Sequence, residues 1–202
     1  MLRALLLDMD GVLVDSYAAW FALTNDLARR LACPAIDPET FRRAWGQSVD
    51  DDARQFFPGH AADRIRALYE EHISAHLDHV RVDPAAARVF AVARAHRLAT
   101  AVVTNTPRAM AAVILDGACL RPDVLVCGTD VAAAKPAPDM LLAACRQLRV
   151  ATSEALMIGD SRFDRQAAAA ASVRFVGLGI AGDMSIAGLS ELLPLVAQTV
   201  DA

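Results

Sequence analysis

The feature that most constrains the fold is a series of short apolar runs, each followed by a polar loop. These runs occupy residues 4–7, 98–103, 124–127, 155–158 and 173–176. An apolar run that is this short favours a buried strand over a helix. From residue 85 onward, stretches with helical spacing separate the runs. Strands that alternate with helices predict an α/β fold, with a mainly parallel sheet covered by helices on both faces.

Residues 16–82 follow a different pattern. Trp20, Leu23 and Leu27 recur at helical spacing, and Asp37 precedes Pro38 as a helix cap would. The segment contains no strand-like run. We therefore expect about four helices, the last over residues 61–79, inserted as a small cap after the first strand. The predicted domains are a core of residues 1–15 and 83–202 and a cap of residues 16–82, with hinges at both connections.

Composition excludes several classes of partner. The formal net charge of -4 provides no broad cationic field for nucleic acid. The four cysteines include no C-x-x-C pair, which favours free thiols over a zinc or redox site. The first apolar run lacks the length of a signal peptide, and no segment approaches the ~20 apolar residues of a membrane span. We expect a cytoplasmic protein without nucleic-acid or membrane partners.

Two carboxylates follow the first predicted strand. Asp8 and Asp10 would point the same way if the chain stayed extended beyond that strand. Such a pair needs a neutralising partner, and Mg²⁺, which binds one or two carboxylates together with phosphate and water, is a suitable one. The alternative is an ordinary polar turn, because Asp10 is followed by Gly11.

Other polar residues follow the later strands. Asp160 and Ser161 come after residues 155–158 and could supply a second metal carboxylate, with Asp164 one helical turn further on. Thr104 and Asn105 end the second predicted strand. Each of these groups could instead only cap a helix. The carboxyl ends of parallel strands meet at one edge of a sheet, so all four polar segments should share one crevice.

Lys135 lies in a loop between prolines, and a lysine that stands alone in such a loop is usually solvated. Its position beyond a predicted strand is nevertheless compatible with the same crevice. Together, the carboxylates, hydroxyl, amide and ammonium suit magnesium-dependent phosphoryl transfer.

The order of these segments resembles that of the haloacid dehalogenase superfamily, in particular its phosphatases with a helical cap of the phosphoglycolate phosphatase kind. Residues 8–15 match the first motif, Thr104 and Asn105 the second, Lys135 with Pro136 the third, and residues 159–164 the fourth. The resemblance covers nearly the whole chain. It implies a Rossmann-like core and a mobile cap.

The resemblance also implies a role for each residue. Asp8 would be the nucleophile that forms an aspartyl-phosphate, and Asp10 the general acid and base. Mg²⁺ would be held by Asp8, Asp160 and the backbone carbonyl of Asp10. The remaining expected residues are Thr104, Asn105 and Lys135 for the phosphoryl oxygens, Gly11, Ser161 and Asp164 as supports, and Trp45, Gly46 and Gln47 as a cap loop over the substrate.

Several alternatives stay open. A hexose-phosphate mutase would use the same residues, and a catalytically silent binding protein could keep the same scaffold. The expected substrate is a small phosphate ester, with phosphoglycolate or a sugar phosphate as the best guesses. The paired arginines of the cap could reach a substrate carboxylate or only be solvated, and His72, His76 and His79 most simply form a solvated surface. The sequence does not distinguish a monomer from a homodimer.

Overall fold

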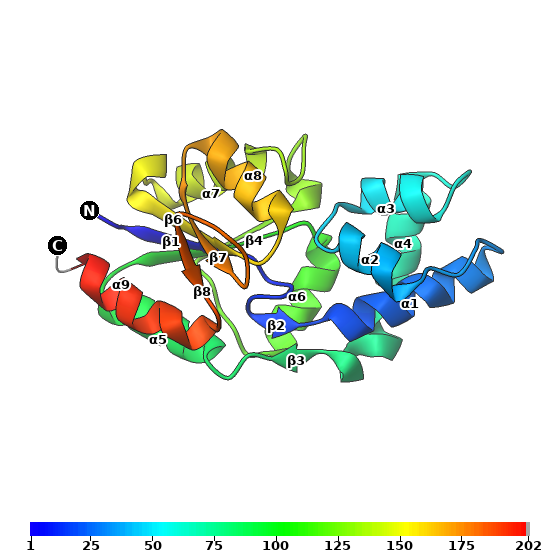
Figure 1. Ribbon diagram of the computed structural model, residues 1–202, viewed down its shortest axis with the longest axis horizontal. Helices are drawn as coiled ribbons and strands as arrows, with labels where there is room; N and C mark the ends of the chain where they lie inside the picture. The colour runs from blue at the N-terminus through cyan, green and yellow to red at the C-terminus, as the bar shows by residue number, and fades with distance from the viewer. Residues whose placement is uncertain (201–202) are drawn as a thin grey trace.

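The computed structural model describes residues 1–200 and places six strands in one parallel sheet (Figure 1). In the order in which they cross the sheet, the strands are β5 (Val124–Cys127), β4 (Ala99–Thr104), β1 (Ala4–Leu7), β6 (Ala155–Gly159), β7 (Arg174–Leu178) and β8 (Met184–Ile186). Each paired neighbour is parallel. The predicted α/β class is confirmed.

Both faces of the sheet are buried, which explains why its strands are continuous apolar runs. Alternate residues of β1 enter different cores: Leu5 and Leu7 join one hydrophobic cluster, while Ala4 and Leu6 join the other. The first cluster is completed by α5 (Ala86–Ala95), α6 (Arg108–Gly117) and α9 (Leu192–Val200), and the second by α7 (Asp139–Leu148) and α8 (Arg162–Ala171).

The inserted helices lie together at one end of the sheet, on the right of Figure 1. They are α1 (Tyr17–Arg30), α2 (Pro38–Ala44), α3 (Val49–Phe56) and α4 (Ala62–His72), followed by the 3-10 helix η1 (Ile73–His79). Their apolar residues form a third cluster, rich in aromatic rings, in which Phe57 and Tyr69 are fully buried. Met110 of α6 also joins this cluster, so the cap packs directly against the core.

Three local features differ from the expectation. Residues 16–82 do contain a strand, because β3 (Arg81–Val82) pairs antiparallel with β2 (Val14–Asp15). This ribbon joins the two connections between core and cap, and a two-residue strand is too short to show a period. The last cap helix ends at His72 and continues as a 3-10 helix. Strand β8 was also missed, since its three residues include a serine.

The remaining turns are short 3-10 helices: η2 (Gly128–Asp130), η3 (Thr152–Glu154) and η4 (Leu189–Glu191). All four cysteines are free thiols, as expected. No helix within residues 1–200 has the length and apolar character needed to cross a membrane. The domain boundaries stay a prediction.

The strand order reverses at β1. From β1 the chain adds β4 and β5 on one side, then β6, β7 and β8 on the other. A sheet of this kind opens a crevice beyond the carboxyl ends of the strands at the reversal point. The end of β1 therefore lies between the ends of β4 and β6, and the cap covers this edge.

Candidate active site

Three strand ends and one loop bring the predicted side chains together. Asp8 follows β1, Thr104 ends β4, and Asp160 follows β6. Lys135 comes from the loop before α7 and lines the same pocket as Asp8, Asp10 and Thr104. The loop position of Lys135 does not leave it solvated, because its side chain is only 1% exposed.

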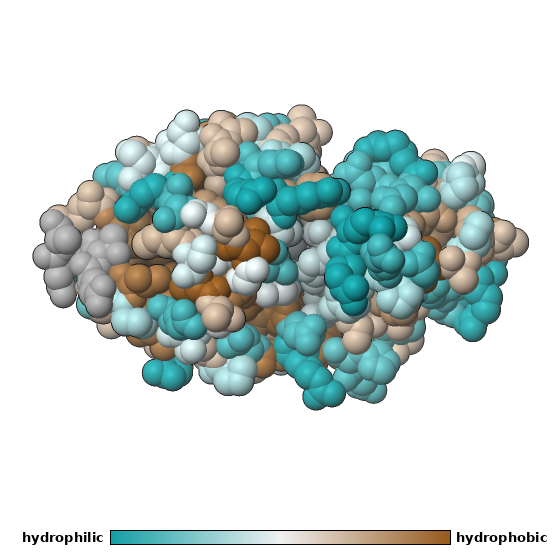
Figure 2. All heavy atoms as spheres, in the orientation of Figure 1, coloured by the Kyte–Doolittle hydropathy of each residue, from teal (hydrophilic) through white to brown (hydrophobic). Residues whose placement is uncertain are grey.

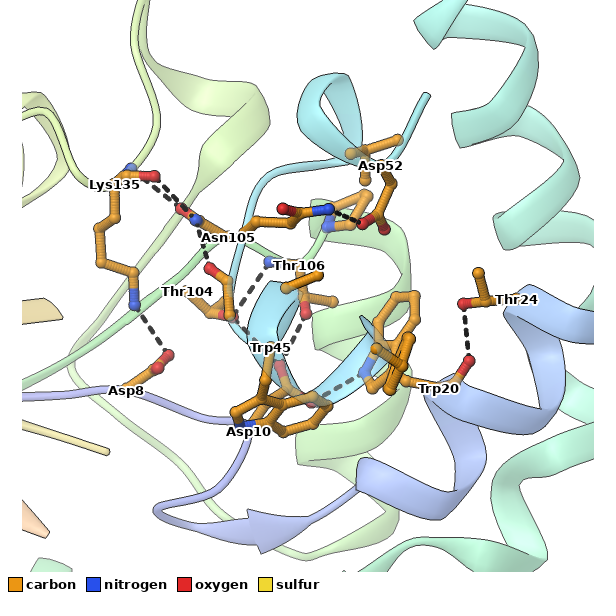
Figure 3. Close-up of a pocket in the computed structure, with 16 residues that line it drawn as sticks. Asp8, Asp10, Trp20, Thr24, Trp45, Asp52, Thr104, Asn105, Thr106 and Lys135 are labelled. Atoms are coloured by element: carbon orange, nitrogen blue, oxygen red, sulfur yellow. Dashed lines mark hydrogen bonds and ion pairs between the residues drawn. The ribbon is translucent and has the colours of Figure 1, made fainter. Parts of the chain in front are cut away.

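Lys135 is the only lysine of the sequence, and it is held between two buried carboxylates. Its Nζ lies 2.9 Å from Asp8 Oδ1 and 2.6 Å from Asp164 Oδ1 (Figure 3 shows the first of these contacts). It also donates to the carbonyl oxygen of Val103 at 2.9 Å. The ammonium is thus fixed beside the carboxylate that follows β1.

Burial sets the protonation of this group. Burial, together with the Asp164 charge, raises the pKa of Asp8 well above its usual range, although Lys135 opposes the shift. Burial alone would lower the pKa of Lys135, but the Asp164 and Asp8 carboxylates outweigh it and raise that pKa. The lysine stays cationic, and a second positive charge near Asp8 would favour its ionised form.

Asp164 is a helix-capping residue as well as a partner of Lys135. Ser161 caps α8: its Oγ accepts from the backbone N–H of Asp164, and Asp164 Oδ2 accepts from the backbone N–H of Ser161 at 3.1 Å. This reciprocal pair is a capping box. The capping role considered from the sequence is therefore real for Ser161, and the same cap orients Asp164 toward Lys135.

Asp160 has an unusual environment. Its Oδ1 is buried without a hydrogen-bond partner, while Oδ2 accepts from the indole N–H of Trp45 at 2.9 Å. Burial and the Asp164 charge raise the pKa of Asp160 to about 6. Gly11, at φ +80°, permits the close approach, because a Cβ there would lie 2.0 Å from Asp160 Oδ2. An orphaned carboxylate oxygen is costly unless something binds it.

The carboxylates of Asp8, Asp160 and Asp164 each offer an oxygen, and these oxygens lie within 4.8 Å of one another. A divalent cation with a preference for oxygen ligands fits this donor set. Asp164 is the least available of the three, since Lys135 and Ser161 already occupy its oxygens. Asp160 has a free oxygen, and both contacts of Asp8, from Met9 N–H and Lys135, involve Oδ1 alone.

Asp10 does not point with Asp8. The chain turns after β1, and the Asp10 carboxylate faces the cap, where it accepts hydrogen bonds from four side chains; Figure 3 draws three of these donors, Trp20, Thr104 and Thr106. The donors are Ser16 Oγ at 2.5 Å, Trp20 Nε1 at 3.0 Å, Thr106 Oγ1 at 2.7 Å and Thr104 Oγ1 at 3.3 Å. The expectation of two carboxylates pointing the same way depended on an extended chain, and that condition is not met, although both carboxylates line the same pocket. The turn reading, raised as the alternative, is correct for the backbone.

Asn105 links the loop that carries Lys135 to the cap. Its Nδ2 donates to the carbonyl oxygens of Gly46 at 2.8 Å and Lys135 at 3.0 Å, and its Oδ1 accepts from the backbone N–H of Lys135 at 3.0 Å. The Asn105 side chain thus fixes the backbone of Lys135 next to the end of β4. It also closes the cap loop over the crevice.

The cap loop lies where the sequence placed it. Trp45, Gly46 and Gln47 all line the pocket, and a Cβ at Gly46 would lie 3.0 Å from the Cβ of Ser161. The paired arginines do not reach the pocket: Arg29, Arg30, Arg42 and Arg43 are exposed. Figure 2 shows hydrophilic side chains over much of the cap on the face drawn.

The sequence reasoning did not assign several other pocket residues to the site, among them the polar side chains of Trp20, Thr106 and Asp52. Trp20 was assigned only to a helix face, and it does belong to the cap cluster. Thr106 directly follows Asn105, so the hydroxyl-rich segment 104–106 was an available signal. Nothing in the local sequence distinguishes Asp52 from its exposed neighbour Asp50.

Comparison with known proteins agrees with this geometry. A family model described as haloacid dehalogenase-like hydrolase matches residues 5–178. The plasmid phosphoglycolate phosphatase of Cupriavidus necator is 32% identical over 179 residues, 84% of this chain and 78% of that protein. The N-acetylmuramic acid 6-phosphate phosphatase of Pseudomonas aeruginosa is 30% identical over 182 residues, covering 81% of this chain and 75% of that protein.

The fold is shared with solved structures as well. A crystal structure of β-phosphoglucomutase from Clostridium difficile superimposes with a TM-score of 0.87 over 100% of this chain and 98% of that one, at 15% identity. The chain is thus similar in sequence to phosphatases and shares its fold with a mutase. The chain belongs to the haloacid dehalogenase-like hydrolase family, and the resemblance found in the motifs is confirmed.

Proposed function

We propose that this protein is a magnesium-dependent phosphatase that hydrolyses a small phosphate monoester through an aspartyl-phosphate on Asp8. The observation that supports this most strongly is the buried group of Asp8, Lys135 and Asp160. It places a carboxylate beside a fixed cation and beside a second carboxylate with an orphaned oxygen. Hydrolysis of phosphate monoesters asks mainly for alignment and charge neutralisation, which this group can provide.

Mg²⁺ would be held by the carboxylates of Asp8 and Asp160 and by the backbone carbonyl of Asp10. When bound, it supplies positive charge next to the phosphoryl oxygens and favours the ionised form of Asp8. Lys135, whose Nζ lies 2.9 Å from Asp8 Oδ1, would neutralise the same oxygens. Thr104 and Asn105 line the pocket beside it and complete the phosphoryl site.

In the first step, an oxygen of Asp8 attacks phosphorus and the bond from phosphorus to the alcohol oxygen breaks. Asp10 gives its proton to the departing alkoxide. In the second step, Asp10 takes a proton from water, whose oxygen attacks phosphorus, and the bond to Asp8 breaks to release phosphate and restore both carboxyl groups. The four hydrogen bonds to Asp10 fix its carboxyl group on the cap side of the pocket.

Residues 16–82 would act as the cap that excludes water during these steps. Three hydrogen bonds hold the cap against the core: from Trp20 to Asp10, from Trp45 to Asp160 and from Asn105 to the carbonyl oxygen of Gly46. A mutase remains the second candidate, favoured by the fold shared with β-phosphoglucomutase. The cytoplasmic location stays a prediction.

The test is phosphate release from a panel of small esters, with Mg²⁺ or with chelator, by wild type, Asp8→Asn and Asp78→Asn. Asp78 is exposed and provides a matched control for the same substitution. We expect turnover that needs Mg²⁺, is retained by Asp78→Asn and is lost in Asp8→Asn. Acid quenching with a ³²P-labelled ester should leave label on the wild-type protein. Turnover that survives Asp8→Asn would refute the proposed nucleophile.

A further inference from the structure

The side of the pocket formed by the cap carries an acidic group that the proposed chemistry does not use. Asp52 of α3 lines the pocket on the cap side, away from Asp8 (Figure 3). It is partly buried, whereas Asp50 of the same helix is exposed. A carboxylate is rarely placed at an apolar cap interface without a partner that needs it.

The Asp52 carboxylate is held in a fixed orientation. Its Oδ1 accepts from Gln47 Nε2 at 2.8 Å and its Oδ2 from the hydroxyl of Tyr69 at 3.1 Å. Tyr69 is itself fully buried and lies 3.4 Å from Thr24 Oγ1. A carboxylate can accept about four hydrogen bonds, so two acceptor positions remain after these contacts.

The pocket is otherwise poor in positive charge. Among its lining residues in the described chain, Lys135 is the sole cation, and it is already paired with Asp8 and Asp164. Asp8, Asp10 and Asp52 are acidic, and the arginines of the cap are outside the pocket. A substrate with a carboxylate or a second phosphate would meet no free cation beyond the phosphoryl site.

We infer that the pocket selects phosphate esters whose alcohol carries a hydrogen-bond donor, a hydroxyl or an ammonium group, and no second anionic group. Asp52 accepts from that donor and repels an anion in the same place. This inference rests on the proposed phosphatase function and specifies its substrate class. It disfavours phosphoglycolate, and it disfavours the bisphosphate that a sugar-phosphate mutase would have to hold.

Ionisation of Asp52 decides the conditions of the test. Burial raises the pKa of Asp52 to about 7, although the hydrogen bonds from Gln47 and Tyr69 oppose the shift. The ionisable groups that face it are Tyr69 of α4 and Asp51 of α3. Assays at about pH 8 keep the carboxylate charged for most of the population.

Three esters of nearly equal size isolate the effect of charge: 2-hydroxyethyl phosphate, phosphoethanolamine and 2-phosphoglycolate. With wild type we expect kcat/KM for the first two to exceed that for phosphoglycolate at least tenfold. Asp52→Asn should remove most of this gap, Asp52→Glu should keep it, and Asp50→Asn, which removes the same charge outside the pocket, should also keep it.

The remaining outcomes separate this inference from the proposed function. Equal or better turnover of phosphoglycolate by wild type would overturn the inference while the phosphatase stands, whether or not the variants fold. A gap that Asp52→Asn leaves unchanged would do the same. Turnover of p-nitrophenyl phosphate with none of the three esters would also overturn the inference alone. Release of phosphate from no ester would refute the phosphatase, and this inference with it.

Discussion

Replacing Lys135 by Met should destabilise the fold by about 3–5 kcal/mol, the usual cost of removing one partner from a buried ion pair. Methionine keeps most of the aliphatic volume, so little of the loss comes from a cavity. The charge, however, has no substitute, because Lys135 is buried between Asp8 and Asp164 and no arginine is among the described residues that line the pocket.

The distances set the scale of the effect. At 2.9 Å and 2.6 Å, each pair gains about 6 kcal/mol of gross Coulomb energy for an effective dielectric constant of ~20. Desolvation of the three buried charges cancels much of that gain in the wild type. In the variant, two carboxylates remain 6% and 0% exposed without a cation. Uptake of a proton by Asp8 limits the loss, which is why the expected loss of stability is smaller than the gross Coulomb energy of the two pairs.

The assay is urea unfolding in chelator at about pH 8 and about pH 5. With a slope of ~2 kcal/mol/M, the midpoint at pH 8 should fall by about 2 M. Lys135 lowers the pKa of Asp8, so its loss raises that pKa further above the unfolded value. The folded state then binds more protons than the unfolded one, and stability falls as the pH rises. The deficit should therefore be larger at pH 8 than at pH 5.

Two controls make this result specific. Arg165→Met removes an exposed cation and should change stability by less than about 0.5 kcal/mol. Lys135→Met with Asp8→Asn removes one of the two stranded charges and should be more stable than Lys135→Met alone. A loss below about 1 kcal/mol at pH 8, or one that is the same at both pH values, would refute the reasoning.

Other substitutions test the surrounding geometry. Gly11→Ala should abolish most magnesium-dependent turnover, because its Cβ would lie 2.0 Å from Asp160 Oδ2. Gly59 also has a positive φ, +88°, but open space around it, so Gly59→Ala should lower stability by only about 1 kcal/mol of backbone strain, measured by thermal unfolding. As the pH falls from about 8 to about 6, Asp52, with a pKa of about 7, gains a proton, so kcat/KM for phosphoglycolate should rise relative to 2-hydroxyethyl phosphate; a flat ratio would contradict this. Asp37→Ala should lower the free energy of unfolding in urea by about 1 kcal/mol, because Asp37 Oδ1 accepts from the backbone N–H of Thr40 at the start of α2. An unchanged free energy would show that α2 does not need this N-terminal hydrogen bond.

Local chemistry in the sequence was enough to predict the framework. Residues 4–7 and 124–127 are short runs that are apolar on both strand faces, which favours buried strands over helices, and both runs match the structure to the residue. Asp37 caps α2 with Pro38 in its first turn, as the pattern indicated. Such features depend on neighbours within a few residues, so they can be predicted from the sequence without knowledge of the fold.

Very short strands and contacts between residues distant in sequence could not be predicted from the sequence. The ribbon of β2 and β3 has two residues in each strand, too few for a period, and it forms only because residues far apart in the chain meet. The separate directions of Asp8 and Asp10 follow from the turn after β1 and from donors on α1 and beyond β4. These partners are distant in sequence, so spacing alone could not assign them.

By itself, the sequence determined which residues stand at the strand ends, and hence the chemical inventory of the crevice. Only the tertiary structure decided the protonation and the orientation of those side chains. Lys135 is buried against Asp8 after β1, Val103 of β4 and Asp164 of α8, and Asp52 lines the pocket although Asp50, two residues earlier, does not. The physical reason is that pKa values and selectivity depend on burial and on pairs of charges, which arise only when separate segments are packed together.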